Sequence, residues 1–300
     1  MLRAISLGLL GLAVSCACVA QAPGLITILE GEALIVRGAN RVRAAEGVRL
    51  AAGDIVETGA NTFAQIEFTD QSVLELGSGT RVLLGGSPKL KLERTMFVLA
   101  GWLKLTNARK DPNARGWEFR SPLIEFGSLP PVVVIQVKPS EVSLFAERGE
   151  LKLVERMAGA APGVVSVKQG QYYRRATGTR GALAPAAAAA FVSGMPRHFR
   201  DSLPLRADRF KDREVAPKPA PDFAYADVEG WLKSETQYFR RQFVERWRAK
   251  ARDGAFRSAL VANLSQHPEW DPILFPEKYL PKPAASAASG TPAFAARPTP

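Results

Sequence analysis

Residues 47–77 read GVRLAAGDIVETGANTFAQIEFTDQSVLELG, and the pattern of this stretch decides the fold. Apolar and polar side chains alternate over residues 63–68, which is the two-residue repeat of a half-buried β-strand. The polar residues 69–72 interrupt this repeat, and the alternation resumes over residues 73–76. Strands this short need neighbours, so the stretch predicts a mainly β domain.

The turns around these strands carry most of the polar residues that stand out. Gly53 and Gly59 can adopt positive φ, and the side chains of Asp54, Thr58 and Asp70 can bond to nearby backbone amides. Turn chemistry accounts for all five residues, and we therefore interpret them as structural rather than catalytic.

The spacing G-x-x-L-x-x-GD-x-I-x-TG-x-x-x-x-A-x-I-x-F-x-D-x-S-x-L-x-L resembles the FecR domain, the periplasmic module of bacterial iron-transport sensors. The residues that carry this resemblance are Gly47, Leu50, Gly53, Asp54, Ile55, Thr58, Gly59, Ala64, Ile66, Phe68, Asp70, Ser72, Leu74 and Leu76. Gln71 stands where the family usually has glycine. The resemblance covers residues 31 to about 176 and implies a β domain of the FecR type in which Gly53, Asp54, Thr58, Gly59, Phe68, Asp70 and Ser72 are structural motif residues.

Short alternating segments recur over the whole of residues 25–176, the expected β domain. They favour a β-roll, a short solenoid or a sandwich, and the pattern does not choose among these three. The predicted strands are residues 25–29, 33–37, 63–68, 72–76, 81–84, 90–92, 102–106, 117–120, 132–137, 142–146, 151–154 and 164–168.

Residues 1–20 have the features of a signal peptide. Arg3 precedes a short apolar run, and small residues follow it at a site compatible with cleavage after Ala20. We therefore expect a periplasmic protein, with lipid anchoring through Cys16 as the less favoured alternative. Since Cys16 and Cys18 are the only cysteines, the mature chain would have no disulfide and no cysteine metal ligand.

The chain changes character after the β domain. Residues 177–221 are rich in Ala and Pro and read as a linker. Within this linker, residues 194–204 carry aromatic and Arg side chains between prolines, so we expect them to dock on the β domain or to contact a separate partner. Residues 281–300, mostly Ala, Pro, Ser and Thr, are expected to form a disordered tail.

Residues 222–280 predict a small helical region. Asp227 can cap a helix that extends to about Arg252, and Asp253 can cap a second helix that ends before Pro268. Apolar residues recur at helical spacing in both segments, so the two helices are expected to pair and to form a small core of their own. Residues 270–275 would fold back over this core.

Charge and motifs exclude several functions. The net charge of +11 is spread along the chain, which is not the pattern of a nucleic-acid-binding surface. His198 and His267 are the only histidines and neither has a second ligand at metal spacing, so no metal and no cofactor are expected. No catalytic motif is present, and the acidic residues Glu67, Asp70, Glu147 and Glu150 are expected to be solvated.

We therefore expect a non-enzymatic periplasmic protein that acts as a binding or scaffold module in the cell envelope. Its partner would be an envelope protein or an anionic envelope polymer, and the mature chain would have no transmembrane helix. The alternative is an envelope signalling component related to iron-transport sensors. That arrangement needs a cytoplasmic anti-sigma segment, for which only two residues precede Arg3. A cell-wall enzyme is the least favoured hypothesis.

Overall fold

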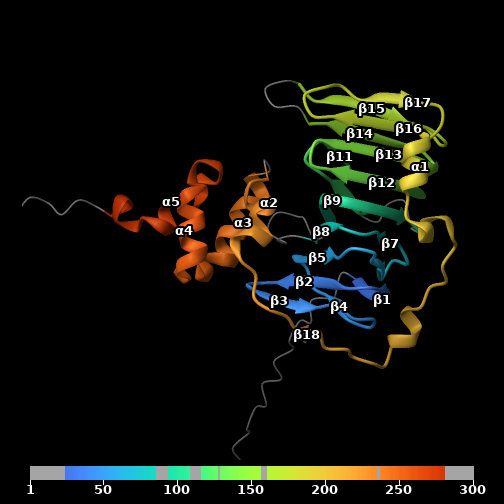
Figure 1. Ribbon diagram of the computed structural model, residues 1–300. Coiled ribbons are helices and arrows are strands. Elements are labelled where there is room, and N and C mark those ends of the chain that lie inside the picture. The colour runs from blue at the N-terminus through green and yellow to red at the C-terminus, as the bar shows by residue number, and fades with distance from the viewer. Residues whose placement is uncertain are drawn as a thin grey trace, which may run out of the picture.

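The computed structural model describes residues 24–85, 94–108, 116–127, 129–156, 161–234 and 237–280 (Figure 1). In these residues the chain forms a curled, almost entirely antiparallel β-sheet, and a few helices follow it. This confirms the predicted fold class. The expected signal peptide at 1–20, the predicted strand at 90–92 and the expected tail at 281–300 lie outside the described residues.

The sheet has two halves, sheet A and sheet B, which share one strand. Sheet A has the order β4 (Arg49–Leu50), β1 (Gly24–Glu30), β6 (Phe63–Glu67), β7 (Val73–Leu76), β9 (Thr95–Thr106), β12 (Val132–Lys138), β13 (Glu141–Arg148), β16 (Tyr172–Ala176) and β17 (Ala182–Ala184). Sheet B has the order β18 (Lys218–Pro219), β3 (Asn40–Arg43), β2 (Ala33–Arg37), β5 (Asp54–Thr58), β8 (Arg81–Leu84), β9, β10 (Glu118–Arg120), β11 (Ile124–Phe126), β14 (Leu151–Glu155) and β15 (Gly163–Val167).

Strand β9 joins the two halves. Its first part pairs in sheet B with β8 and, in parallel, with β10, and its second part pairs in sheet A with β7 and β12. Gly101 lies at the crossing with φ +110°, and a Cβ atom there would lie 2.3 Å from Thr80 Cα. Only glycine fits such a backbone. The sequence prediction of a strand at 102–106 therefore found half of β9.

The two halves enclose one apolar core. Alternate residues point inward from both, so that Ile26, Ile66 and Leu74 of sheet A meet Ile35 and Val82 of sheet B in a single cluster. At one side Phe68 packs on Trp117, with 4.2 Å between ring centroids. Of the three architectures that the sequence left open, this arrangement is closest to a sandwich.

The C-terminal helices cover part of the outer face of sheet B, over β2, β5, β8 and the first part of β9. The helices are α2 (Tyr225–Leu232), α3 (Gln237–Trp247), η4 (Arg248–Arg252), α4 (Gly254–Ala262), η5 (Leu264–Gln266), η6 (Pro268–Trp270), α5 (Asp271–Leu274) and η7 (Pro276–Tyr279). Trp231, Trp247 and Trp270 are buried in one cluster that includes Ile55 and Phe97 of the sheet. The helices therefore do not form a core of their own, contrary to the sequence-based expectation.

One predicted helix start is wrong and the other is confirmed. Asp227 is the third residue of α2, where its Oδ2 accepts a hydrogen bond from Ala224 N at 2.8 Å, and α2 ends at Leu232 instead of continuing. The last turn tightens, since Ser234 N bonds to the carbonyl oxygen of Trp231, and this ends the helix. Asp253 caps α4 as predicted, accepting from Phe256 N at 2.8 Å.

The outer face of sheet A is covered by residues 189–207, which we call the strap. It contains α1 (Ala189–Gly194) and η2 (Arg197–Arg200) and lies on the side of the sandwich opposite the helices (Figure 1). Phe191 and Phe199 of the strap are buried with Phe63, Val134 and Tyr172 of the sheet. Residues 194–204 thus dock on the chain's own β domain, which is the first of the two outcomes expected for them. Beyond the strap, η3 (Ala207–Phe210) and β18 lead back to sheet B.

Candidate functional site

A cleft of about 490 Å³ lies between the strap and the outer face of sheet A. Strands β6, β7, β9, β12 and β13 form its floor, and residues 200–203 and Leu205 of the strap form its wall. The lining residues are Gln65, Gln71, Val73, Glu75, Lys104, Thr106, Ala108, Val132, Glu147, Arg148, Arg200, Asp201, Ser202, Leu203 and Leu205.

A row of polar side chains crosses the floor of this cleft. Gln65, Glu75 and Lys104 lie directly opposite one another on β6, β7 and β9. Their neighbours along each strand point into the core, so strand alternation sends these three outward. All three are nevertheless buried, because the strap lies over them.

The polar groups of Gln65 and Lys104 in this row have hydrogen-bond partners, and several bonds in this region hold the strap. Gln65 Nε2 donates to Thr27 Oγ1 at 3.2 Å and to Glu67 Oε1 at 3.0 Å. Lys104 Nζ donates to the carbonyl oxygen of Phe199 at 2.5 Å and lies 3.3 Å from Glu147 Oε2. The Glu67 carboxylate accepts from the backbone N–H groups of residues 206 and 207, at 2.7 and 3.1 Å. Glu67 is therefore buried and bonded, contrary to the expectation that it is solvated.

Glu75 is the exception in this row. Its side chain is 5% exposed, and Oε1 has no hydrogen-bond partner among the described residues. Burial raises the pKa of Glu75 to about 7. The Lys104 ammonium opposes this shift, and the carboxylates of Glu147 and Asp201 add to it. A carboxyl group with this pKa changes its protonation state near neutral pH, and Oε1 remains a buried acceptor without a partner among the described residues.

The motif residues predicted from sequence lie elsewhere, mostly at turns of sheet B. Asp54 is buried and accepts hydrogen bonds from the Arg37 guanidinium and, at 2.8 Å, from Ala51 N. Gly53 has φ +86°. Thr58 Oγ1 donates to the carbonyl oxygen of Gly77 at 2.6 Å and accepts from Thr80 N at 2.8 Å. The side chains of Asp54 and Thr58 therefore both form hydrogen bonds that stabilise turns.

The other motif positions include one wrong expectation. Gly59 does not have positive φ; instead, a Cβ atom there would lie 3.2 Å from the Glu32 carbonyl oxygen, so close backbone approach favours glycine. Gln71, at the position where the family has glycine, does adopt a left-handed backbone with φ +63°. Asp70 Oδ1 accepts from Ser72 N at 3.0 Å and closes this turn.

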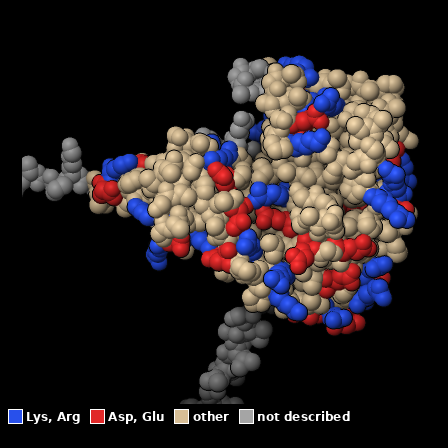
Figure 2. All heavy atoms as spheres, viewed as in Figure 1, with Lys and Arg blue, Asp and Glu red and all other residues tan. Residues whose placement is uncertain are grey.

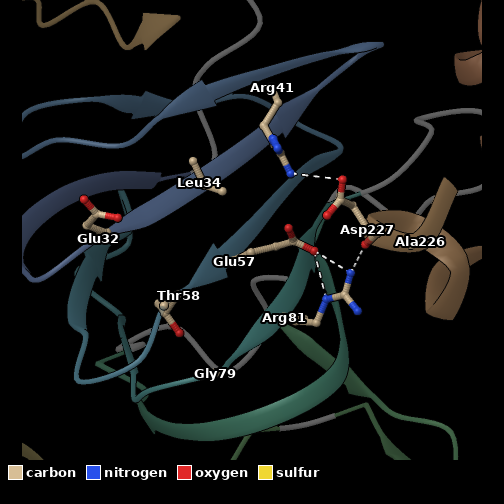
Figure 3. Close-up of a pocket in the computed structure, with 10 residues that line it drawn as sticks. Glu32, Leu34, Arg41, Glu57, Thr58, Gly79, Arg81, Ala226 and Asp227 are labelled. Carbon is tan, nitrogen blue, oxygen red and sulfur yellow. Dashed lines mark hydrogen bonds and ion pairs between the residues drawn. The ribbon is translucent and has the colours of Figure 1, made fainter. Parts of the chain in front are cut away.

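A second hollow, of about 430 Å³, lies between sheet B and the start of α2 (Figure 3). Arg41 and Asp227 form an ion pair across it at 3.3 Å, and Arg81 pairs with Glu57 at 2.8 Å. Arg81 also donates to the Asp227 carbonyl oxygen. Because these groups satisfy one another, they hold α2 on the sheet and leave no unpaired acceptor comparable to Glu75.

The histidines do not form a metal site. His198 stacks on Phe63 and its Nε2 lies 3.0 Å from Glu30 Oε2, whereas His267 is buried against Tyr225 Oη at 3.0 Å. Burial lowers the pKa of His267. Within the described ranges, no three His, Cys, Asp or Glu residues are grouped so that they could hold a metal ion. None of the helices described in the structure is long and apolar enough to span a membrane.

Comparison with known proteins finds only a weak structural similarity to two solved structures. No protein-family model matches the chain, and no curated protein matches it. Two crystal structures of a "putative anti-sigma factor" from Parabacteroides distasonis are similar, at 13% and 12% sequence identity and a TM-score of 0.36 each. The likeness covers 47% of this chain and only 64% and 65% of those two chains. Similarity at this level carries no argument about function.

Proposed function

We propose that the chain is a non-enzymatic binding module of the cell envelope, exported to the periplasm, and that the cleft under the strap recognises a protein partner. Glu75 carries this proposal, since a buried carboxylate with an unused oxygen lies in a cleft that is large enough to admit a side chain. A donor that reached Oε1 would form a charge-assisted hydrogen bond away from competing water.

The surroundings of Glu75 favour a basic side chain of a protein over an anionic polymer. The charged groups that act on Glu75 are the Lys104 ammonium and the carboxylates of Glu147 and Asp201, so carboxylates outnumber the cation. Arg148 and Arg200 also line the cleft and give its mouth mixed charge. Figure 2 shows Lys and Arg scattered among Asp and Glu on the face in view, without one continuous basic patch. A Lys or Arg side chain of a partner fits this site best.

One observation supports envelope signalling as the second candidate function. The strap is hydrogen-bonded to Lys104, which lies opposite Glu75, and to Glu67, which is bonded to Gln65 on the other side of Glu75. A partner that binds Glu75 would therefore change the charge next to the groups that hold the strap. Such coupling between a binding site and a second segment of the chain is what a signalling component requires.

Site-specific photo-crosslinking in living cells tests the proposed function. A photoreactive phenylalanine analogue at Leu205, an exposed cleft residue, is expected to capture a partner, whereas the same analogue at exposed Val261 on α4 is not. Glu75→Gln should abolish the Leu205 adduct, because the amide keeps the shape but loses the acceptor charge. Equal capture at both positions, or capture that Glu75→Gln leaves unchanged, would contradict the proposal.

A further inference from the structure

The curled sheet has four edge strands among the described residues, and three of them are poor templates for pairing. In sheet A these are β4, which has two residues, and β17, which has three and is followed directly by Pro185. In sheet B, β18 consists of Lys218 and Pro219. Short length, proline and lysine are the usual means by which edge strands avoid adding another strand.

The fourth edge, β15, has none of this protection. Its five residues read GVVSV, with no charge and no proline, and they pair with β14 in continuous register without a bulge. Val164 is 70% exposed, and Val165 is half-buried against the core cluster. Arg180 lies against Gly163, the first residue of the strand, and among the described residues only β14 is paired with β15. In Figure 1, β15 lies at one end of the stack of strands.

We propose that β15 pairs antiparallel with β15 of a second copy of this chain, so that sheet B continues across a two-fold axis. An axis at Val165 would place Val164 opposite Ser166 of the copy and Lys168 opposite Pro162, so no like charges would meet. The half-buried Val165 would lie opposite Val165 of the second copy, and this pair would extend the apolar core across the axis.

The size of the contact sets its strength. A five-residue strand buries far less than the roughly 1,200 to 2,000 Å² of a stable complex, so the dimer is weak and forms at high protein concentration. We choose a second copy of this chain as the partner because the uncharged strand can pair with itself without placing like charges opposite each other. A strand of a different protein is the competing outcome.

Analytical ultracentrifugation over a concentration series provides the first test. The parent protein is expected to dimerise reversibly, and Val164→Lys should weaken the dimer at least tenfold by placing like charges across the axis. Val261→Lys is the matched control, since Val261 is also an exposed valine, on α4, and this change should have no effect. Circular dichroism checks that both variants fold. Equal dimerisation of Val164→Lys and the parent would overturn the proposal.

Disulfide trapping locates the axis. Cys16 and Cys18 are the only cysteines, so replacing both with serine allows single cysteines to be placed at 164, 165, 166 and 167. Mild oxidation should trap the dimer best at 165, and not at a control cysteine at 261. A protein that remains monomeric and yields no disulfide at any β15 position overturns the inference. So does a β15 edge that crosslinks only to a different protein.

Discussion

Asp54 and Glu75 are both buried carboxylates, and their surroundings give them different roles. Asp54 has the Arg37 guanidinium and a backbone amide as donors, which stabilise its charge. Glu75 lies across the sheet from Lys104, but Lys104 Nζ is directed to Phe199 and Glu147 instead. A paired carboxylate stabilises the fold, whereas an incompletely paired one costs stability and is available to a ligand.

Replacing Asp54 with Ala tests its structural role. The change removes the ion pair with the partly exposed Arg37 guanidinium and leaves the Ala51 amide without its acceptor, so unfolding should become easier by about 2 to 3 kcal/mol. This exceeds the roughly 1 kcal/mol of a turn bond alone. Chemical denaturation would measure the change, and capture of the partner well below the melting temperature should survive it. Unchanged stability together with lost capture would make this turn a binding site.

The raised pKa of Glu75 predicts that the stability of the protein depends on pH. Its folded-state pKa of about 7 exceeds the ordinary 4.5, so between these values the folded chain binds more protons than the unfolded chain. The free energy of unfolding should therefore fall as pH rises from about 4 to about 8, by on the order of 3 kcal/mol.

Glu75→Gln should remove this pH dependence and be more stable than the parent at alkaline pH. Glu147→Gln serves as the control, since Glu147 is more exposed and should leave most of the slope in place. Denaturation curves at several pH values would show the difference. An identical slope in the parent and in Glu75→Gln would refute the assignment.

At the scale of elements, the strap is the segment whose position decides whether the cleft exists. It is held by Phe199, which is buried against Phe63 with 6.5 Å between ring centroids, and by hydrogen bonds to Lys104 and Glu67. Since α1 and η2 are too short to be stable alone, these contacts maintain its conformation.

Phe199→Ala should loosen the strap without unfolding the sandwich. Losing a buried phenylalanine costs about 3 kcal/mol, which corresponds to roughly a 100-fold increase in the open population. Trypsin should then cut after Arg197 or Arg200 much faster, as followed by mass spectrometry. Leu205→Ala, at an exposed strap residue, is the matched control and should leave the cutting rate unchanged. Equal rates for both variants would show that Phe199 does not anchor the strap.

At the scale of the whole molecule, the residues that follow β17 pack on both outer faces of the sandwich. The strap packs on sheet A, and the helices pack on part of sheet B through a cluster that includes Val36, Ile55, Leu83 and Phe97. The β region and the helical region therefore share buried surface, and the junction between them is reinforced by the Arg41–Asp227 ion pair and by the hydrogen bond from Arg81 to the Asp227 carbonyl oxygen (Figure 3).

Local pattern was sufficient to predict most strands, the Asp253 cap and the mainly β class, because alternation and capping involve residues close together in the chain. It was not sufficient for β9, whose two halves serve different sheets, or for the end of α2.

The candidate site could not be predicted from the sequence, and the reason is physical. Gln65, Glu75 and Lys104 read as outward-facing residues of short strands, and on an open sheet they would be solvated. Burial of Glu75, and with it the raised pKa, arises because the strap, more than 100 residues later in the chain, packs over that face. A contact between segments so far apart depends on how the whole chain folds, so only the tertiary structure distinguishes Glu75 from the solvated acids.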